Sequence, residues 1–162
     1  MIFPEQPPKP QEHWLRLTEG PAEGEPVVEE VVVVSGYKSY TDSLITGSEK
    51  SDATAESHEC QIRVGPKWRT VKGVSPIATV SAFSHYNSND ADDAGYGVDL
   101  CKWFFEIEPT PDPSLGAQIL LKVFLHARGG PDFSIRGIAY HLVARGVLAQ
   151  GQDQAFEDHR QL

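Results

Sequence analysis

The sequence predicts an all-β protein, an antiparallel β-sandwich of about 6–8 strands with an extended, proline-rich N-terminal arm. Three observations carry this prediction. Stretches of alternating apolar and polar residues recur along the chain, segments rich in Gly, Pro, Asn and Asp separate them, and the one amphipathic helical stretch is short and C-terminal. We therefore divide the chain into an arm (1–26), a sandwich domain (27–150) and a polar C-terminal tail (151–162).

Composition limits the classes of function. With 162 residues, of which 40% are hydrophobic, the chain is long enough for one domain with a sizeable core. Its formal net charge of -9 repels a phosphate backbone, so we expect no nucleic-acid partner. The sequence has no apolar run of membrane-spanning length and no signal-peptide pattern, so by default we expect a cytoplasmic protein or a component of an assembled particle.

The N-terminal arm is defined by its prolines. Each proline lacks a backbone donor and disfavours helix at the residue before it. Six of them fall in the first 26 residues, namely Pro4, Pro7, Pro8, Pro10, Pro21 and Pro26. Trp14, Leu15 and Leu17 are the apolar anchors of this segment. We expect an extended arm that either stays loose or lies across a neighbouring subunit.

The first half of the domain predicts three strands. Six valines make residues 27–40 a strong strand signal, since β-branched side chains pack well on a pleated surface. Residues 41–57 are polar and without periodicity, which predicts a loop. Residues 58–65 and 67–74 alternate apolar and polar side chains, which predicts a hairpin that turns at Gly65 and Pro66.

The second half predicts four more strands, at residues 75–86, 97–109, 117–127 and 133–148. The segments between them are rich in Gly, Pro, Asn or Asp, so the chain turns there. In the second of these strands Trp103 and Phe105 alternate with charged residues, with Phe104 as the exception, and we place both in the core or in a subunit interface. In the last strand we expect His141 to be a core histidine.

The segment 85–97, HYNSNDADDAGYG, is a strongly polar connector. Its amides and carboxylates are oxygen ligands of the kind that Ca²⁺ takes, with Asn89, Asp92 and Asp93 as the candidates. The residue order of an EF-hand loop is missing, however, and neighbouring Asp92 and Asp93 point to opposite sides of an extended chain. We therefore assign no metal and no cofactor, with calcium as the alternative.

Motifs for catalysis are missing from the sequence. A nucleophile elbow, a phosphate-binding glycine loop and closely spaced histidine ligands are all absent. Glu106 and Glu108 share one strand face, where a solvent-facing pair of charges is a better interpretation than an acid and a base. Cys60 and Cys101 each lie in a predicted strand, as two free thiols or as one buried bridge. Enzyme activity stays open, and a non-catalytic role is favoured.

The order of segments over residues 74–146 resembles the H-type lectin domain. Residues 75–77 match the opening strand of that family, Leu125 and His126 its Trp-His step, and residues 140–144 its closing strand. The resemblance implies a six-stranded sandwich that trimerises and binds galactose-type sugars. Leu125 stands where the family has its sugar-stacking Trp, so only His126 carries over as a sugar contact.

We accordingly expect a non-catalytic, lectin-like module that recognises carbohydrate within a homo-oligomer. We expect six residues at loop tips to contact a polar ligand, which would be a glycan. They are Tyr86, Asn87, Asp90, His126, Arg128 and Asp132. The first alternative is a structural or assembly protein, such as a virion or tail component, whose arm reaches across to the next subunit. The second is a small β-barrel enzyme or ligand carrier with an internal cavity.

Overall fold

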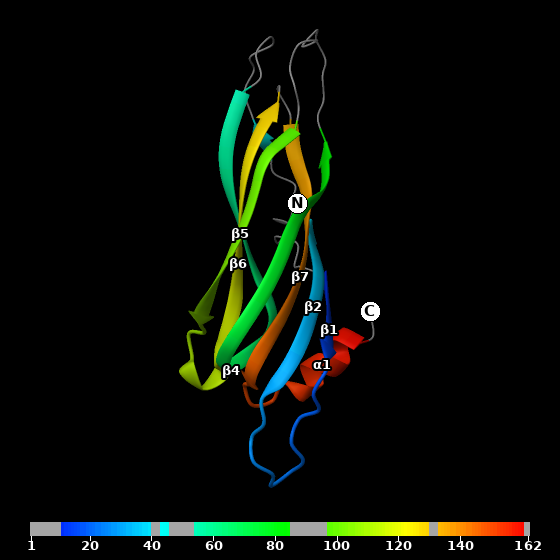
Figure 1. Cartoon of the computed structure of the whole chain (residues 1–162), viewed down its shortest axis with the longest axis vertical. Coiled ribbons are helices and arrows are strands. Elements are labelled where there is room, and N and C mark those ends of the chain that lie inside the picture. Colours follow the sequence, from blue (N-terminus) through cyan, green and yellow to red (C-terminus); the bar gives the residue numbers. More distant parts are fainter. Residues whose placement is uncertain (1–10, 40–42, 46–53, 85–96, 130–132, 161–162) are drawn as a thin grey trace, which may run out of the picture.

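The computed structural model describes residues 11–39, 43–45, 54–84, 97–129 and 133–160 (Figure 1). This part of the chain is mostly β, with one short helix near the C-terminus. The strands are β1 (Gln11–Arg16), β2 (Glu30–Ser39), β3 (Ser43–Ile45), β4 (Thr54–Ser84), β5 (Gly97–Pro109), β6 (Ala117–Gly129) and β7 (Phe133–Leu148). A 3-10 turn, η1 (Pro113–Leu115), joins β5 to β6, and the helix is α1 (Asp153–Arg160).

Six strands form one sheet in the order β1-β2-β7-β4-β6-β5, and the short β3 pairs with β7 off this path. Every pairing is antiparallel. The sheet is not closed, because β1 and β5 lie at its two ends. The predicted β class and antiparallel pairing are confirmed, whereas the finer prediction of a sandwich is not shown. No helix within the described ranges could span a membrane.

The longest strand, β4, changes direction halfway along its length. Its residues up to Val64 pair with β6, and those from Trp68 onward pair with β7, while Trp68 itself also pairs with Ala117 of β6. Gly65 lies at the change of direction with a φ of 73°, a left-handed conformation that glycine adopts without strain. The turn is therefore where the sequence predicts it, but the predicted hairpin is wrong, because the two halves pair with different strands.

The bend in β4 is held by side chains from distant parts of the chain. A bend leaves backbone groups without ladder partners, and buried ones must find others. The N–H of Gly65 donates to Oε2 of Glu12 at 3.1 Å, and its carbonyl accepts from Nε2 of Gln118 at 2.9 Å. The N–H of Lys67 donates to Oε1 of Gln152 at 3.1 Å. Glu12 and Gln152, which lie outside the predicted domain, thus help to fix the bend together with Gln118.

Both terminal segments pack against the sheet more closely than the sequence predicts. Residues 11–16 of the expected arm form β1, which pairs with β2 of the same chain, and Trp14 is buried. In the expected polar tail, Phe156 of α1 is also buried, with its ring edge-on to Trp14 at 5.4 Å between centroids. Each segment thus contributes a buried aromatic residue to the contact between β1 and α1.

Two smaller predictions need correction. The expected loop 41–57 contains β3 and the beginning of β4. His141 is exposed, and its Nδ1 lies 2.9 Å from Oγ of Ser35. The opposite face of β7 supplies the buried residues, including Tyr140 and Leu142. Both faces of β7 carry apolar side chains, so the alternation by itself placed the face of His141 in the core, whereas the face of Tyr140 and Leu142 is the buried one.

One hydrophobic core gathers residues from both halves of β4 and from the strands that pair with them. Ile62 lies in the first half and Trp68 begins the second, and both are fully buried. Leu121 and Leu125 of β6 and Leu142 of β7 join the same core. Burying a side chain of this size contributes about 1.5–3 kcal/mol, so this cluster holds the bent sheet together.

Candidate functional site

Most residues predicted to bind a ligand lie outside the part of the chain that the structure describes. They are Tyr86, Asn87, Asp90 and Asp132, together with the calcium candidates Asn89, Asp92 and Asp93. His126 is half-buried within β6, which continues to Gly129, so it does not lie at a loop tip. Arg128 lies two positions further along β6, opposite Gly97 of β5. The glycan site is therefore still a prediction.

The cysteines form no bridge, and no metal centre is present in the described residues. No three His, Cys, Asp or Glu side chains of these ranges converge as ligands. Cys60 is buried, Cys101 is half-buried, and both are free thiols. Burial raises the pKa of the Cys101 thiol, against a backbone hydrogen bond that lowers it. A thiol with a raised pKa is a poor nucleophile at neutral pH.

A cluster of exposed apolar side chains lies on β5, at one end of the sheet. Trp103, Phe104, Phe105 and Ile107 are 37%, 52%, 40% and 40% exposed. We call residues 101–107 the β5 edge. Only β6 pairs with this strand among the described residues, so its outer backbone groups are free to pair with another strand.

The β5 edge carries aromatic side chains on both of its faces. The residues of β6 opposite Trp103 and Phe105 are fully buried, so these two side chains face the core and lie at its open margin. Phe104 points to the other face, where its ring lies edge-on to Phe124 of β6 at 5.6 Å between centroids. The alternation predicted for Trp103 and Phe105 is correct, and the sheet leaves both rings partly uncovered.

Charged side chains accompany Phe104 on the outer face. Nζ of Lys122 donates to Oε1 of Glu106 at 3.0 Å, and this bond raises the pKa of Lys122. Nη2 of Arg63 donates to Oε1 of Glu108 at 3.0 Å. The two glutamates therefore form separate ion pairs, which fits surface charges better than an acid-base pair. The side chain of Lys102 has no ion pair or hydrogen bond with any residue of the described ranges.

The other end of the sheet is covered. α1 packs beside β1, as Figure 1 shows. The ring of His159 in α1 stacks on Trp14 with 3.7 Å between centroids, and its Nδ1 lies 3.0 Å from the carbonyl oxygen of Glu12. The two end strands thus differ, because a helix protects β1 while the β5 edge stays open.

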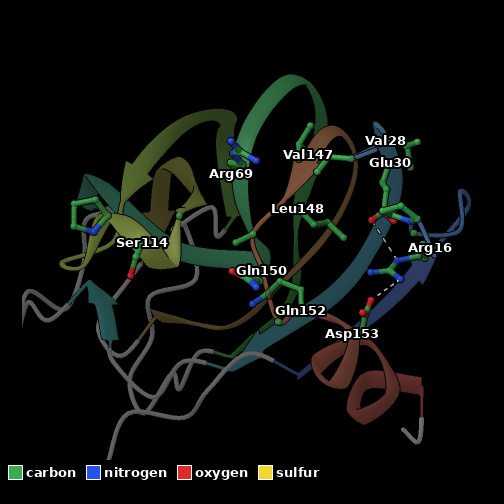
Figure 2. Close-up of a pocket in the computed structure, with 17 residues that line it drawn as sticks. Arg16, Val28, Glu30, Arg69, Ser114, Val147, Leu148, Gln150, Gln152 and Asp153 are labelled. Carbon is green, nitrogen blue, oxygen red and sulfur yellow. Dashed lines mark hydrogen bonds and ion pairs between the residues drawn. The ribbon is translucent and has the colours of Figure 1, made fainter. Parts of the chain in front are cut away.

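An open cleft of about 590 Å³ lies where α1 begins (Figure 2). Nη1 of Arg16 donates to Oδ1 of Asp153 at 2.9 Å, and its Nε lies 3.4 Å from Oε2 of Glu30. The guanidinium also lies 4.3 Å from the ring centroid of Phe156. Burial raises the pKa of Glu30, Arg16 lowers it and Asp153 raises it further. Arg16 is therefore paired within the fold, and Arg69 is a second cation in the lining of the cleft.

Glu12 of β1 is a buried carboxylate that the sequence gives no reason to place inside. Its Oε2 accepts a hydrogen bond from Nε1 of Trp14 at 2.7 Å, and its Oε1 accepts one from the hydroxyl of Tyr140 at 2.6 Å. The N–H of Gly65 is its third donor. Three donors on one buried carboxylate make a structural anchor for β1.

The sequence analysis places Trp103 and Phe105 in the core or in a subunit interface, and the sequence carries one further signal for the β5 edge. Phe104 interrupts the alternation of β5, so this strand has large apolar residues on both faces. A strand with two apolar faces is buried on both sides or lies against a partner. Which of the two applies depends on the strand order, and that is visible only in the structure.

Comparison with protein-family models, with curated proteins and with solved structures found no match to this chain. The resemblance to the H-type lectin domain therefore rests on the sequence pattern alone.

Proposed function

We propose that this protein is a non-catalytic assembly module that forms a homo-oligomer through the β5 edge. The observation that carries the proposal is the open end strand with Trp103, Phe104 and Phe105 exposed on it. Native proteins usually blunt such edges with charges, prolines or a covering segment, because an exposed apolar edge pairs with other chains. Residues 101–107 contain no proline, and beside the charges of Lys102 and Glu106 they keep four large apolar side chains.

The position of the N-terminal segment also supports β5 as the joining edge. In a structural protein of the kind expected from the sequence, an arm would reach across to the next subunit. Here residues 11–16 pair with β2 of their own chain, and α1 covers them. A contact through the β5 edge needs no rearrangement of this segment.

We also infer that the bent sheet acts as a two-layer sandwich. Residues of both halves of β4 share one core, and Sγ of Cys101 in β5 lies 3.8 Å from the carbonyl oxygen of Ala78 in the second half of β4. β5 then forms the margin of one layer and the second half of β4 the margin of the other. A partner strand on β5 would close the core at this margin.

Sedimentation over a hundredfold range of protein concentration tests the proposal. The wild-type chain should exceed the monomer mass of 17.8 kDa, and Phe104→Lys should be a monomer, because it places a charge in the centre of the edge. Leu15→Lys is the matched control, since Leu15 is 45% exposed on the opposite end strand and should not alter assembly. Thermal unfolding checks that each variant is folded. A monomeric wild-type chain, or equal assembly of all three proteins, would refute the proposal.

A further inference from the structure

The β5 edge has a pattern that is complementary to itself. Phe104 lies at its centre, with Trp103 and Phe105 on either side of it. Lys102 and Glu106 come next, with opposite charges, and then the apolar Cys101 and Ile107. Read from Phe104 in either direction, the order is aromatic, charged, apolar, and the two charges have opposite signs.

This pattern matters because of how two identical edge strands pair. An antiparallel pair related by a two-fold axis normal to the sheet keeps the faces of both copies on the same sides. With Phe104 on the axis, Trp103 of one copy lies opposite Phe105 of the other on the core side. The two Phe104 rings meet on the outer face, beside Phe124 of each copy, which already contacts Phe104.

The charges match in the same register. Lys102 lies opposite Glu106 of the second copy, and this pair occurs twice because of the symmetry. The side chain of Lys102 has no ion pair or hydrogen bond with the described residues of its own chain. Glu106 accepts one hydrogen bond from Lys122 at 3.0 Å and is 59% exposed, so its carboxylate has room for a second donor.

Neighbouring registers lose this match. The faces stay aligned only when the strands shift by an even number of residues. One such shift places Lys102 opposite Phe104 of the second copy, and the other places Phe104 opposite Glu106. Each shift replaces the contact between the two Phe104 rings with a contact between Phe104 and a charged side chain. The register centred on Phe104 is therefore preferred.

We propose that the partner of the β5 edge is a second copy of this chain, paired antiparallel in a closed dimer whose two-fold axis passes beside Phe104. The inference rests on the proposed function and adds the partner, the symmetry and the register. A two-fold contact of this kind uses the same edge on both copies and ends at two chains, whereas β5 against a different edge would continue into a filament.

Charge reversal with mixing tests the register. In a Lys102→Glu homodimer, the introduced carboxylate of each copy faces Glu106 of the other, and in a Glu106→Lys homodimer the introduced ammonium group of each copy faces Lys102 of the other. Each variant alone should therefore dimerise with a dissociation constant raised about tenfold or more. An equimolar mixture should form a heterodimer with near wild-type affinity, because both of its charge pairs are attractive. Native mass spectrometry with a mass tag on one variant identifies the mixed species.

Two further variants control the experiment. Arg69→Glu makes the same charge change at an exposed position of β4 and should dimerise like the wild-type chain. Because Glu106→Lys also places a lysine beside Lys122, a double variant with Lys102→Glu and Glu106→Gln in one chain provides a second route. It removes the like-charge pair and should bind more tightly than Lys102→Glu alone.

The outcomes separate this inference from the proposed function. If Phe104→Lys loses the wild-type assembly, the β5 edge joins the subunits. If, in addition, mixing the charge variants restores no dimer, or the wild-type assembly exceeds two chains, the two-fold register is wrong. If Phe104→Lys assembles like the wild-type chain, both proposals fail. Rescue in the mixture, with a mass of two chains, supports both.

Discussion

Removal of the buried carboxylate of Glu12 should weaken the whole fold, although Glu12 lies in a segment that the sequence assigns to an arm. In the variant Glu12→Ala, the indole N–H of Trp14, the hydroxyl of Tyr140 and the N–H of Gly65 lose their acceptor. All three come from parts of the molecule that meet at the bend in β4. The variant therefore acts on the attachment of β1 and on the bend together.

The expected loss follows from the count of these donors. Each buried donor without a partner costs about 1–3 kcal/mol, which gives a gross loss of about 3–9 kcal/mol for the three. Removing a buried carboxylate also removes its desolvation penalty, which is several kcal/mol. We expect a net loss of about 3 kcal/mol, which lowers Tm by about 6–12 °C for a chain of this length.

Thermal and urea unfolding at one fixed protein concentration measure this loss, since the stability of an assembling protein depends on concentration. Tyr140→Phe removes one donor and should lose less, and the double variant should show coupling between the two positions. Glu19→Ala is the control, because Glu19 is exposed, and should stay within about 0.5 kcal/mol of the wild-type chain. A Glu12→Ala variant as stable as Glu19→Ala would refute the anchoring role.

Three further predictions concern the sheet and the cleft. Gly36→Ala should lower Tm by several degrees, because a Cβ at this position would collide with the ring of Tyr140, whereas Gly73→Ala should leave Tm unchanged, because no atom lies within 4 Å of such a Cβ. Asp153→Ala should change the unfolding free energy by at most about 1 kcal/mol, since this carboxylate is 86% exposed. A larger loss would mean that the ion pair of Asp153 with Arg16 is essential to the fold. Burial raises the pKa of Glu30 above its ordinary 4.5, so Glu30 keeps its proton to a higher pH in the folded state than in the unfolded state. The free energy of unfolding therefore falls as the pH rises from 4.5 through the folded pKa. Glu30→Gln should remove this decline from a series of melting curves, and an unchanged pH dependence would contradict the assignment.

The sequence predicted the β class and most strand positions, because alternation and turn residues are local signals. The last strand, at residues 133–148, and β5, at 97–109, agree with the structure at both ends. The pairing of the two halves of β4 was not predictable in this way. A turn at Gly65 predicts only that the chain changes direction, and the choice between a hairpin and two separate pairings depends on distant strands.

The terminal segments were underestimated for a related reason. Proline content and polarity describe the average of a segment, while docking depends on single residues. Glu12 and Trp14 fix β1, and Phe156 fixes α1. The candidate site shows the same limit: Phe104 marked β5 as unusual, but only the strand order leaves β5 at an open end of the sheet.

Hydrogen exchange of the β5 backbone tests most directly whether this edge is the joining surface. A second strand would bind the outward N–H groups of residues 101–107, and β1 serves as the internal reference. Exchange in this segment should slow as the protein concentration rises, and Phe104→Lys should remove this protection, while exchange in β1 stays constant. Exchange at residues 101–107 that is equally fast at every concentration, and equal in the variant, would contradict it.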